Sequence, residues 1–470
     1  MLYLRIFGHY IHTPYLLMAA AEGVIVVAAA YLGFYLRYQS WPGFWGHAIP
    51  AGSFAFIIIV AMLSMGVYES RIREGFSGMM LRTAVAVFLL GALATAVLSY
   101  LSQVLFMSRG ALLLSSGSAF VLIALWRWFA FSVVSEEALK RRVVVLGTGR
   151  RALKVASRMR RKSDQRAFVL LGYLPVGSEE PDLVSAYGGY VYRNDLNLLR
   201  FCQEHRVEEI VVAVDERRRG EAPDSGLPLD DLIECRMSGV HVCDVQVFVE
   251  REACKVDIDL LRPGWLAFAD GFVMRTRHKM IKRTFDLIAA VGILALAWPV
   301  MLAVAACIRL ETRGPAIYRQ ERVGRGGRVF RLMKFRSMIF SDEDDEAGWT
   351  RQNDPRITRV GSFIRKTRLD EFPQLFNVLR GDMSFVGPRP ERPVFVEQLK
   401  AQIPYYDQRH RVKPGITGWA QLCYPYGASV DDSKEKLQYD LYYLKNQSLM
   451  LDLIILLQTV EVVLVGEGAR

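Results

Sequence analysis

The chain has 470 residues, 52% of them hydrophobic, and its mean hydropathy is +0.17. This length suggests about three domains and this hydropathy points to membrane segments, so a single small soluble domain is excluded. The formal net charge of +11 suits an anionic partner, and because apolar segments adjoin basic runs, membrane lipid and phosphorylated substrates are favoured over nucleic acid.

Four apolar stretches occupy the first third of the chain, and each is long enough to cross a bilayer core of about 30 Å as a helix. They are residues 14–36, 48–68, 81–106 and 111–134. Basic residues gather after the second and fourth stretches, so the positive-inside rule predicts that both ends of the bundle are cytoplasmic. Only Glu22 is a deeply placed acid, which favours an anchor over a transport pathway. We therefore expect a four-helix transmembrane region over residues 1–137.

A β-branched run from Arg142 to Leu146 precedes a glycine turn, Gly147-Thr148-Gly149, and a helical pattern. This order resembles the opening of a Rossmann-type unit, in which a helix N-terminus can hold a phosphate. Further strand candidates are residues 168–174, 209–214 and 240–245, and residues 216–228 are expected to form a surface loop. The alternation predicts a Rossmann-like α/β domain with a doubly wound parallel sheet over residues 138–268. No acid closes the second strand, which favours a structural glycine turn over a dinucleotide site.

The next apolar run, residues 287–308, is long enough to span a membrane, but basic residues flank both of its ends. Pro299 lies near its middle, where proline removes a helical hydrogen bond and introduces a kink. A bent hairpin over residues 282–310 that enters and leaves by the same face satisfies both observations. The last apolar segment, residues 449–464, is interrupted by polar residues and is expected to lie along the membrane surface.

Two adjacent acids, Asp370 and Glu371, lie inside the basic and otherwise apolar stretch 366–390. Such a pair suits phosphate chemistry on a metal, with one carboxylate as nucleophile or base and the other holding Mg²⁺. The alternative is that Asp370 caps a helix that contains Pro373 in its first turn and stops at Gly381. The residues alone leave both readings open.

Several runs in the last third occur in a recognisable order. They are residues 282–286, the proline-broken segment, and residues 314–324, 330–338, 353–358, 366–390 and 412–421. Together they resemble the bacterial sugar transferases, monotopic phosphoglycosyl transferases that start glycan assembly on polyprenyl phosphate. The resemblance implies an α/β catalytic domain over residues 269–470 with a re-entrant membrane helix hairpin. The whole architecture looks like the large members that prime exopolysaccharide synthesis, nearest to the exosortase-associated group.

The resemblance implies that a sugar 1-phosphate passes from a UDP-sugar to undecaprenyl (polyprenyl) phosphate with release of UMP. Asp370 matches the family's nucleophile, which forms a covalent aspartyl-phosphosugar, and Glu371 matches its Mg²⁺ ligand. The implied location is the bacterial inner membrane, with the catalytic domain on the cytoplasmic face. Where the family commonly has serine before the proline of the membrane break, this chain has Trp298 before Pro299.

The resemblance also assigns cationic and uridine-side positions. Arg365 corresponds to the family's phosphate-orienting arginine and Pro388-Arg389-Pro390 to its uridine-side motif. Lys334 and Arg336 lie in the matching Lys-Phe-Arg-Ser-Met run and are expected to face the phosphates. The acidic run 342–346 is expected to be a solvated loop.

Two other function classes compete. One is an NAD-dependent nucleotide-sugar modifying enzyme built on the middle domain, which lacks both the second-strand acid and a Tyr-x-x-x-Lys pair. The other is a membrane-anchored regulator that senses a nucleotide, and it predicts no UMP release. The identity of the sugar, the ligand of the middle domain, the glycan pathway and the formation of a homodimer stay open.

Overall fold

The computed structural model describes residues 3–6, 9–41, 43–68, 76–133, 140–159, 168–176, 182–192, 197–215, 227–261, 269, 271–272, 276–339, 356–424, 427 and 429–465. The chain divides into two compact units. Most of the first unit is Tyr10–Met62 and Gly66–Arg262, and most of the second is Pro263–Arg470.

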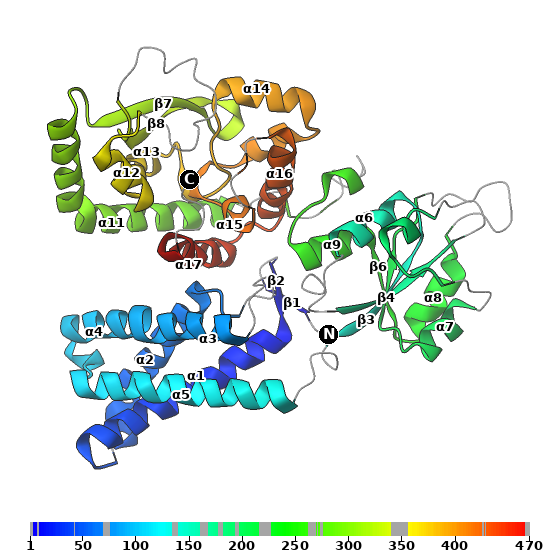
Figure 1. Ribbon diagram of the computed structural model, residues 1–470, viewed down its shortest axis with the longest axis horizontal. Helices are drawn as coiled ribbons and strands as arrows, with labels where there is room; N and C mark the ends of the chain where they lie inside the picture. The colour runs from blue at the N-terminus through cyan, green and yellow to red at the C-terminus, as the bar shows by residue number, and fades with distance from the viewer. Residues whose placement is uncertain are drawn as a thin grey trace. The chain divides into compact units, whose positions relative to one another are not determined.

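The first third of the chain is a bundle of long apolar helices (Figure 1). A two-stranded sheet of β1 (Tyr3–Ile6) and β2 (His9–His12) precedes it. The helices are α1 (Thr13–Tyr38), α2 (Phe44–Ser64), α3 (Phe76–Ala84), which continues through the π-helical turn η1 (Val85–Gly91) into α4 (Ala92–Leu101), and α5 (Arg109–Val133). By length and composition they provide four candidate membrane spans, which overlap the four predicted stretches.

A buried ion pair joins these helices. Glu22 on α1 and Arg127 on α5 are both fully buried and form two charge-assisted hydrogen bonds of 2.6 and 2.7 Å. The Tyr68 hydroxyl donates to the Glu22 carboxylate at 2.5 Å, and Arg127 donates to the Thr83 hydroxyl of α3 at 2.5 Å. Because the charges are paired inside the bundle, Glu22 and Arg127 join α1 to α5, and Arg127 also bonds to α3.

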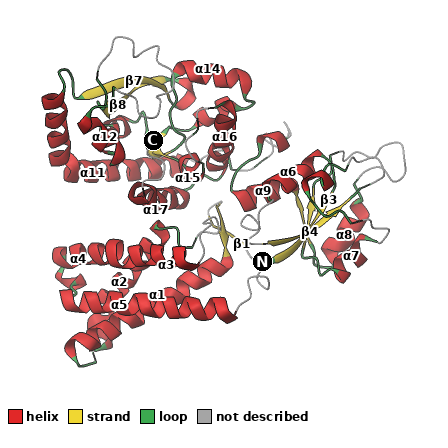
Figure 2. Cartoon of the chain, in the orientation of Figure 1, coloured by secondary structure: helices red, strands yellow, loops and turns green. Residues whose placement is uncertain are grey.

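The middle of the chain is an α/β domain with a four-stranded parallel sheet (Figure 2). The strands β3 (Arg141–Leu146), β4 (Phe168–Leu174), β5 (Glu209–Val212) and β6 (His241–Asp244) lie in the order β4-β3-β5-β6. Helices α6 (Arg150–Arg158) and α9 (Val245–Ala253) pack on one face, and α7 (Leu198–Glu204) and α8 (Leu229–Met237) pack on the other. The predicted doubly wound sheet is confirmed. Residues 216–226 of the predicted loop lie outside the described residues.

The second unit combines small sheets with short helices. Strands β7 (Ile317–Val323) and β8 (Val329–Phe335) form an antiparallel hairpin, and β9 (Ser384–Val386) pairs in parallel with β10 (Gly415–Thr417). The helices are α12 (Arg359–Lys366), α13 (Gln374–Arg380), α14 (Pro393–Gln402), α15 (Trp419–Cys423), α16 (Val430–Lys445) and α17 (Leu449–Val465). The acidic run 342–346 lies outside the described residues.

The helix α11 (Thr276–Glu311) contains Pro299 and is apolar enough to be a fifth candidate span. Figure 1 shows that it changes direction sharply along its length, as expected of a helix in which proline removes a backbone donor. Its first part packs on α13, and its second part packs on α12 and the region of β8. Large apolar side chains such as Ile288, Leu296 and Trp298 are exposed along it. Both ends therefore contact one compact unit, while an apolar surface faces outward.

The last helix, α17, confirms the apolar segment predicted near the C-terminus. Leu449, Met450 and Leu453 are exposed on it, whereas Asp452 is 1% exposed. The Asp452 carboxylate lies 2.6 Å from the ammonium group of Lys282 on α11. Asp452, one of the polar residues that interrupt this apolar segment, therefore forms a buried ion pair between the two apolar helices.

Candidate active site

The two adjacent acids lie next to the lysine of strand β8. Asp370 and Glu371 are on a short 3-10 turn, η8 (Leu369–Glu371), and both are largely buried. The Lys334 ammonium lies 3.2 Å from Glu371 Oε1 and 3.9 Å from Asp370 Oδ2. The structure therefore brings together three of the residues that the sequence singled out.

Asp370 does not cap a helix. Helix α13 begins at Gln374, after Pro373, and no side chain bonds to its first amides at the cap position. The prediction of a cap is wrong because the 3-10 turn separates the acid pair from the helix. The predicted end of the helix is confirmed: Gly381 has φ 93°, a left-handed conformation that glycine adopts without steric cost.

Glu371 is surrounded by cations. Besides Lys334, the guanidinium groups of Arg368 and Arg389 lie 3.6 and 3.8 Å from its Oε1 atom. Burial by itself raises the pKa of Glu371, but Lys334, Arg389 and Arg368 together lower that pKa to about 2. Glu371 is therefore fully ionised at neutral pH.

Asp370 has the opposite electrostatic character. Burial raises the pKa of its carboxyl group, and the neighbouring charge of Glu371 raises it further, whereas Lys334, Arg368 and Arg365 lower it in part. The net result is a pKa above the ordinary value of an aspartate. An ionised carboxylate that is poorly stabilised by its surroundings is a better nucleophile than one held by strong hydrogen bonds.

Arg365 lies in the last turn of α12, and its charge acts on Asp370. Between them the chain reverses at Arg368, whose φ of 57° is left-handed, a conformation uncommon outside glycine. Such backbone conformations persist where surrounding contacts hold them, and they concentrate at functional sites. This turn joins α12, which carries Arg365, to η8, which carries the two acids.

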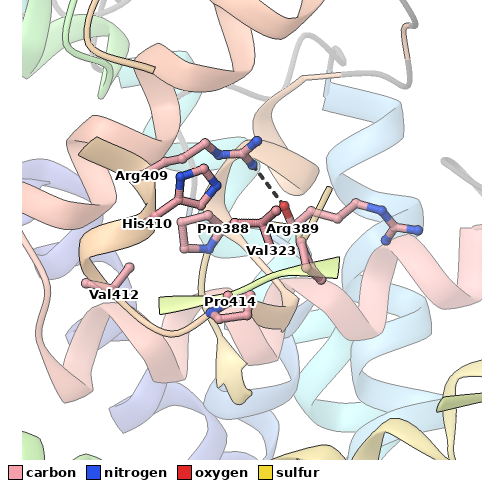
Figure 3. A pocket seen from close by; sticks show the side chains of 9 residues that line it. Val323, Pro388, Arg389, Arg409, His410, Val412 and Pro414 are labelled. Atoms are coloured by element: carbon pink, nitrogen blue, oxygen red, sulfur yellow. Dashed lines mark hydrogen bonds between the residues drawn. The ribbon is translucent and has the colours of Figure 1, made fainter. Parts of the chain in front are cut away.

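The Pro388-Arg389-Pro390 motif follows strand β9 and borders a small pocket. The pocket is lined by Val323, Gly324, Pro388, Arg389, Pro390, Arg409, His410, Val412 and Pro414 (Figure 3). Arg409 donates to the backbone oxygen of Arg389 at 3.0 Å, and the amide of Gly415 donates to the oxygen of Pro388 at 3.0 Å. These bonds fix the motif's backbone while the Arg389 guanidinium lies near Glu371.

Arg409 was missed by the sequence analysis. It is buried, its guanidinium forms an ion pair with the Asp440 carboxylate at 2.9 Å, and it donates a hydrogen bond to the Tyr406 hydroxyl at 2.6 Å. Burial raises the pKa of Asp440 to about 6, although Arg409 opposes the shift. The only sequence signal was a run of basic residues before Val412, which does not separate buried from exposed arginines.

Arg336 bonds to the residues that follow α11. Its guanidinium donates to the backbone oxygens of Arg313 and Thr312 at 2.9 Å each and to the Thr312 hydroxyl at 2.7 Å. The resemblance implies that Arg336 faces the phosphates together with Lys334. Residues two apart share one face only while a strand continues, and β8 ends at Phe335, between the two cations. These bonds indicate that Arg336 holds the end of α11.

Asn377 is a second residue that the sequence analysis missed. It is fully buried on α13, accepts from the Met333 amide at 3.0 Å and donates to the Arg331 oxygen at 2.8 Å. The side chain thus bonds to the backbone of β8 as a neighbouring strand would. Since Lys334 follows Met333, Asn377 fixes the register of the lysine strand against the helix that follows the acids.

In the middle domain, a carboxylate of the chain itself bonds to the helix that follows the glycine turn. The carboxylate of Asp215, which follows β5, accepts from the amides of Arg150 and Arg151 at 2.7 and 2.8 Å. These are the first amides of α6, where a Rossmann-type unit would place a phosphate. This arrangement favours the structural reading of the turn.

One group of potential metal ligands lies in the middle domain. Glu209, His241 and Cys243 bring their ligand atoms within 4.8 Å of one another. However, Glu209 forms ion pairs with Arg141 and with Arg251, the latter at 2.9 Å. Two cations on one carboxylate oppose the binding of a third positive charge, so Glu209 belongs to an ion network with the two arginines.

Comparisons with known proteins match two parts of the chain. A family model described as "Bacterial sugar transferase" matches residues 277–466, which include the acid pair and α11. A second model, described as "CoA-binding domain", matches residues 64–219, which include the first three strands of the middle domain.

Three curated proteins show the similarity in detail. A UDP-N-acetylgalactosamine-undecaprenyl-phosphate N-acetylgalactosaminephosphotransferase of Aeromonas hydrophila is 44% identical over 239 residues, covering 51% of this chain and 56% of that protein. An undecaprenyl-phosphate glucose phosphotransferase of Komagataeibacter xylinus is 34% identical over 69% of this chain and 59% of that protein. A UDP-glucose:undecaprenyl-phosphate glucose-1-phosphate transferase of Caulobacter vibrioides is 39% identical over 44% of this chain and 77% of that protein. The chain thus spans little more than half the length of the first two relatives.

Proposed function

The chain belongs to the bacterial sugar transferase family, and from this membership and the site geometry we propose that it transfers a sugar 1-phosphate from a UDP-sugar to undecaprenyl phosphate. The observation that carries the proposal is the pair of adjacent carboxylates with opposed pKa shifts beside Lys334, Arg365, Arg368 and Arg389. In this proposal the reaction starts the assembly of an exopolysaccharide or related glycan.

The proposed reaction has two displacements. The Asp370 carboxylate attacks the β-phosphorus of the UDP-sugar, the bond from that phosphorus to the bridging oxygen of the diphosphate breaks, and UMP leaves with the electron pair. The phosphate oxygen of undecaprenyl phosphate then attacks the aspartyl-bound phosphorus and frees the carboxylate, giving undecaprenyl diphosphate-sugar. Dividing the transfer in this way lets one site accept a water-soluble donor and a lipid acceptor in turn.

The chain's cations stabilise the charge that develops on the phosphoryl oxygens. Lys334 and Arg389 lie on the Glu371 side of the pair, and Arg365 acts on the Asp370 side. Fixed cations in a largely buried site stabilise a transition state more than they would in water, because they need no reorganisation during the reaction. The pocket beside Pro388-Arg389-Pro390 is where we place the uridine end of the donor.

The acid pair suits a magnesium ion chemically. Glu371 is an ionised carboxylate, and Mg²⁺ prefers one or two carboxylates together with substrate phosphates. Three neighbouring cations oppose a metal arriving alone, so we expect the metal to enter with the negatively charged diphosphate. When bound, Mg²⁺ would neutralise charge on the diphosphate oxygens, and Glu371 would hold it.

We also propose that α11 is a re-entrant hairpin at the cytoplasmic face of the inner membrane and that the first four spans are transmembrane. In support, Lys282 near one end of α11 and Thr312 just beyond the other are both hydrogen-bonded within the same compact unit. A helix that crossed a core of about 30 Å would place its two ends on opposite faces. The exposed apolar surface of α11 would then lie in the lipid, close to the isoprenoid acceptor.

The purified full-length chain with Mg²⁺, undecaprenyl phosphate and the matching UDP-sugar should release UMP and form undecaprenyl diphosphate-sugar. A panel of UDP-glucose, UDP-galactose and their N-acetylated forms identifies the donor, since the relatives' names differ in the sugar. Coupled UMP detection and mass spectrometry of the lipid measure the two products. Lipid product without UMP, or no turnover with any donor of the panel, would contradict the proposal.

The proposed topology predicts a contrast between two introduced cysteines. Arg328→Cys lies in the exposed turn before β8, and Gly43→Cys lies in the exposed loop between α1 and α2. Both are placed in a protein whose native cysteines are replaced by serine, because Cys307 is itself exposed. A membrane-impermeant maleimide added to right-side-out vesicles should label Gly43→Cys alone, and inverted vesicles should reverse the result. Labelling of Arg328→Cys from the outside would show that α11 crosses the membrane.

A further inference from the structure

The first end of α11 is bonded to the helix that follows the acid pair. Arg283 donates to the backbone oxygens of Val378 and Leu379 at 2.6 and 2.8 Å. Both oxygens belong to the last turn of α13, where carbonyls lack partners within the helix. Because α13 begins directly after the turn that carries Asp370 and Glu371, Arg283 fixes that turn relative to α11.

The same end of α11 is bonded to the strand that leads to Arg389. Lys282 donates to the oxygen of Val386 at 3.1 Å, and Asp286 accepts from the Ser384 hydroxyl at 3.1 Å and from the Phe385 amide at 3.2 Å. The Val386 oxygen, the Ser384 hydroxyl and the Phe385 amide all belong to β9, and the Pro-Arg-Pro motif follows this strand. The first part of α11 therefore holds both carboxylates and Arg389.

The second end of α11 is bonded to the elements that carry the remaining cations. Arg336, two residues after Lys334, donates three hydrogen bonds to Thr312 and Arg313 at the end of the helix. Glu311 accepts from the first amides of α12, those of Arg359 and Val360, at 2.7 and 3.1 Å. Arg365 lies in the last turn of α12. The second part of α11 therefore holds Lys334 and Arg365.

We propose that α11 is a positioning element of the active site as well as an anchor, with Arg283 and Arg336 as the positioning residues at its two ends. One part of the helix holds the carboxylates, the other holds the cations opposite them, and the bend at Pro299 lies between the two. The ion pair of Lys334 and Glu371, at 3.2 Å, is where the two halves meet. This inference rests on the proposed function, because it concerns the alignment of that reaction's groups.

Conservative replacements test the inference without changing any charge. Arg283→Lys and Arg336→Lys keep the cation but lose the planar guanidinium fork, whose separate nitrogens reach two neighbouring carbonyl oxygens at fixed directions. We expect kcat to fall about 10-fold to 100-fold, the scale for a misplacement of roughly 1 Å, with the KM for the UDP-sugar nearly unchanged. The matched controls are Arg277→Lys, exposed in the first turn of α11, and Arg319→Lys, exposed on β7; both should retain wild-type kcat.

Turnover is counted per molecule that forms the covalent adduct, so a smaller folded fraction does not mimic the effect. The double variant should lose less than the product of the two single losses, because each change disrupts the same alignment. The inference is wrong if both single variants keep the wild-type kcat per competent molecule. If Arg336→Lys does not fold, a wild-type kcat in Arg283→Lys alone overturns it. Losses that multiply strictly in the double variant also overturn it. Absence of UMP release by the wild type overturns the proposed function together with this inference.

Discussion

We expect Asp370→Asn to abolish both UMP release and the covalent phosphosugar adduct, with turnover reduced by at least roughly 10³-fold. The amide that replaces the carboxylate is almost the same size but lacks the negative charge and the nucleophilic oxygen. Intact-protein mass spectrometry after incubation with donor alone should show a gain of one phosphosugar for the wild type and no gain for the variant.

Loss of folding should not explain this result. Burial raises the pKa of Asp370, which means that the folded state disfavours its charge, so above that pKa the ionised group lowers the free energy of unfolding. The neutral asparagine removes this cost, and the melting temperature at neutral pH should equal or exceed that of the wild type. Asp431→Asn, on the exposed first turn of α16, is the matched control and should keep full activity. An adduct on the Asp370→Asn protein would show that another residue is the nucleophile.

The elements of this chain could be predicted because their signals are local. Strand β4 has the predicted bounds, and the four apolar stretches overlap the observed spans, since the length and spacing of apolar residues can be read from each segment by itself. The acid pair stood out as adjacent carboxylates in a basic stretch, whereas the separate roles of the two acids and the choice of Lys334 came from the resemblance to a family. Their 3.2 Å approach depends on how β8 packs against η8.

The contacts that the sequence did not indicate depend on tertiary structure. Arg336 was expected beside Lys334, but the strand ends between them and the guanidinium bonds to the end of α11. No sequence pattern marked Asn377 or Asp215. An asparagine on an apolar helix, or an aspartate before a polar loop, looks the same in the sequence whether or not its side chain bonds to a distant part of the backbone. A sequence pattern identifies which residues are buried or charged, whereas the bonds that position them join segments far apart in the chain.

We expect Glu371→Gln to reduce turnover by about 10²-fold to 10³-fold, the range for removal of one group that stabilises transition-state charge. The variant keeps the nucleophile but loses the carboxylate that balances Lys334, Arg368 and Arg389. The variant leaves these three cations without a counter-charge. When a chelator removes metal ions, UDP should therefore bind roughly threefold to tenfold more tightly to the variant than to the wild type. Isothermal titration without metal measures this affinity independently of turnover.

The stability of Glu371→Gln should change in the opposite direction to that of Asp370→Asn. The folded pKa of Glu371 is about 2, below the ordinary value of about 4.3, so its ionised form stabilises the fold at neutral pH. The variant should therefore melt below the wild type at pH 7, and the difference should shrink as the pH falls through the interval between those two values.

Glu397→Gln, exposed on α14, should match the wild type in melting temperature and turnover. Equal shifts for both acids would mean that they share one environment, and the division into nucleophile and metal ligand would then be wrong. Opposite shifts are expected because Glu371 has three cations around its carboxylate, whereas burial and Glu371 itself dominate at Asp370.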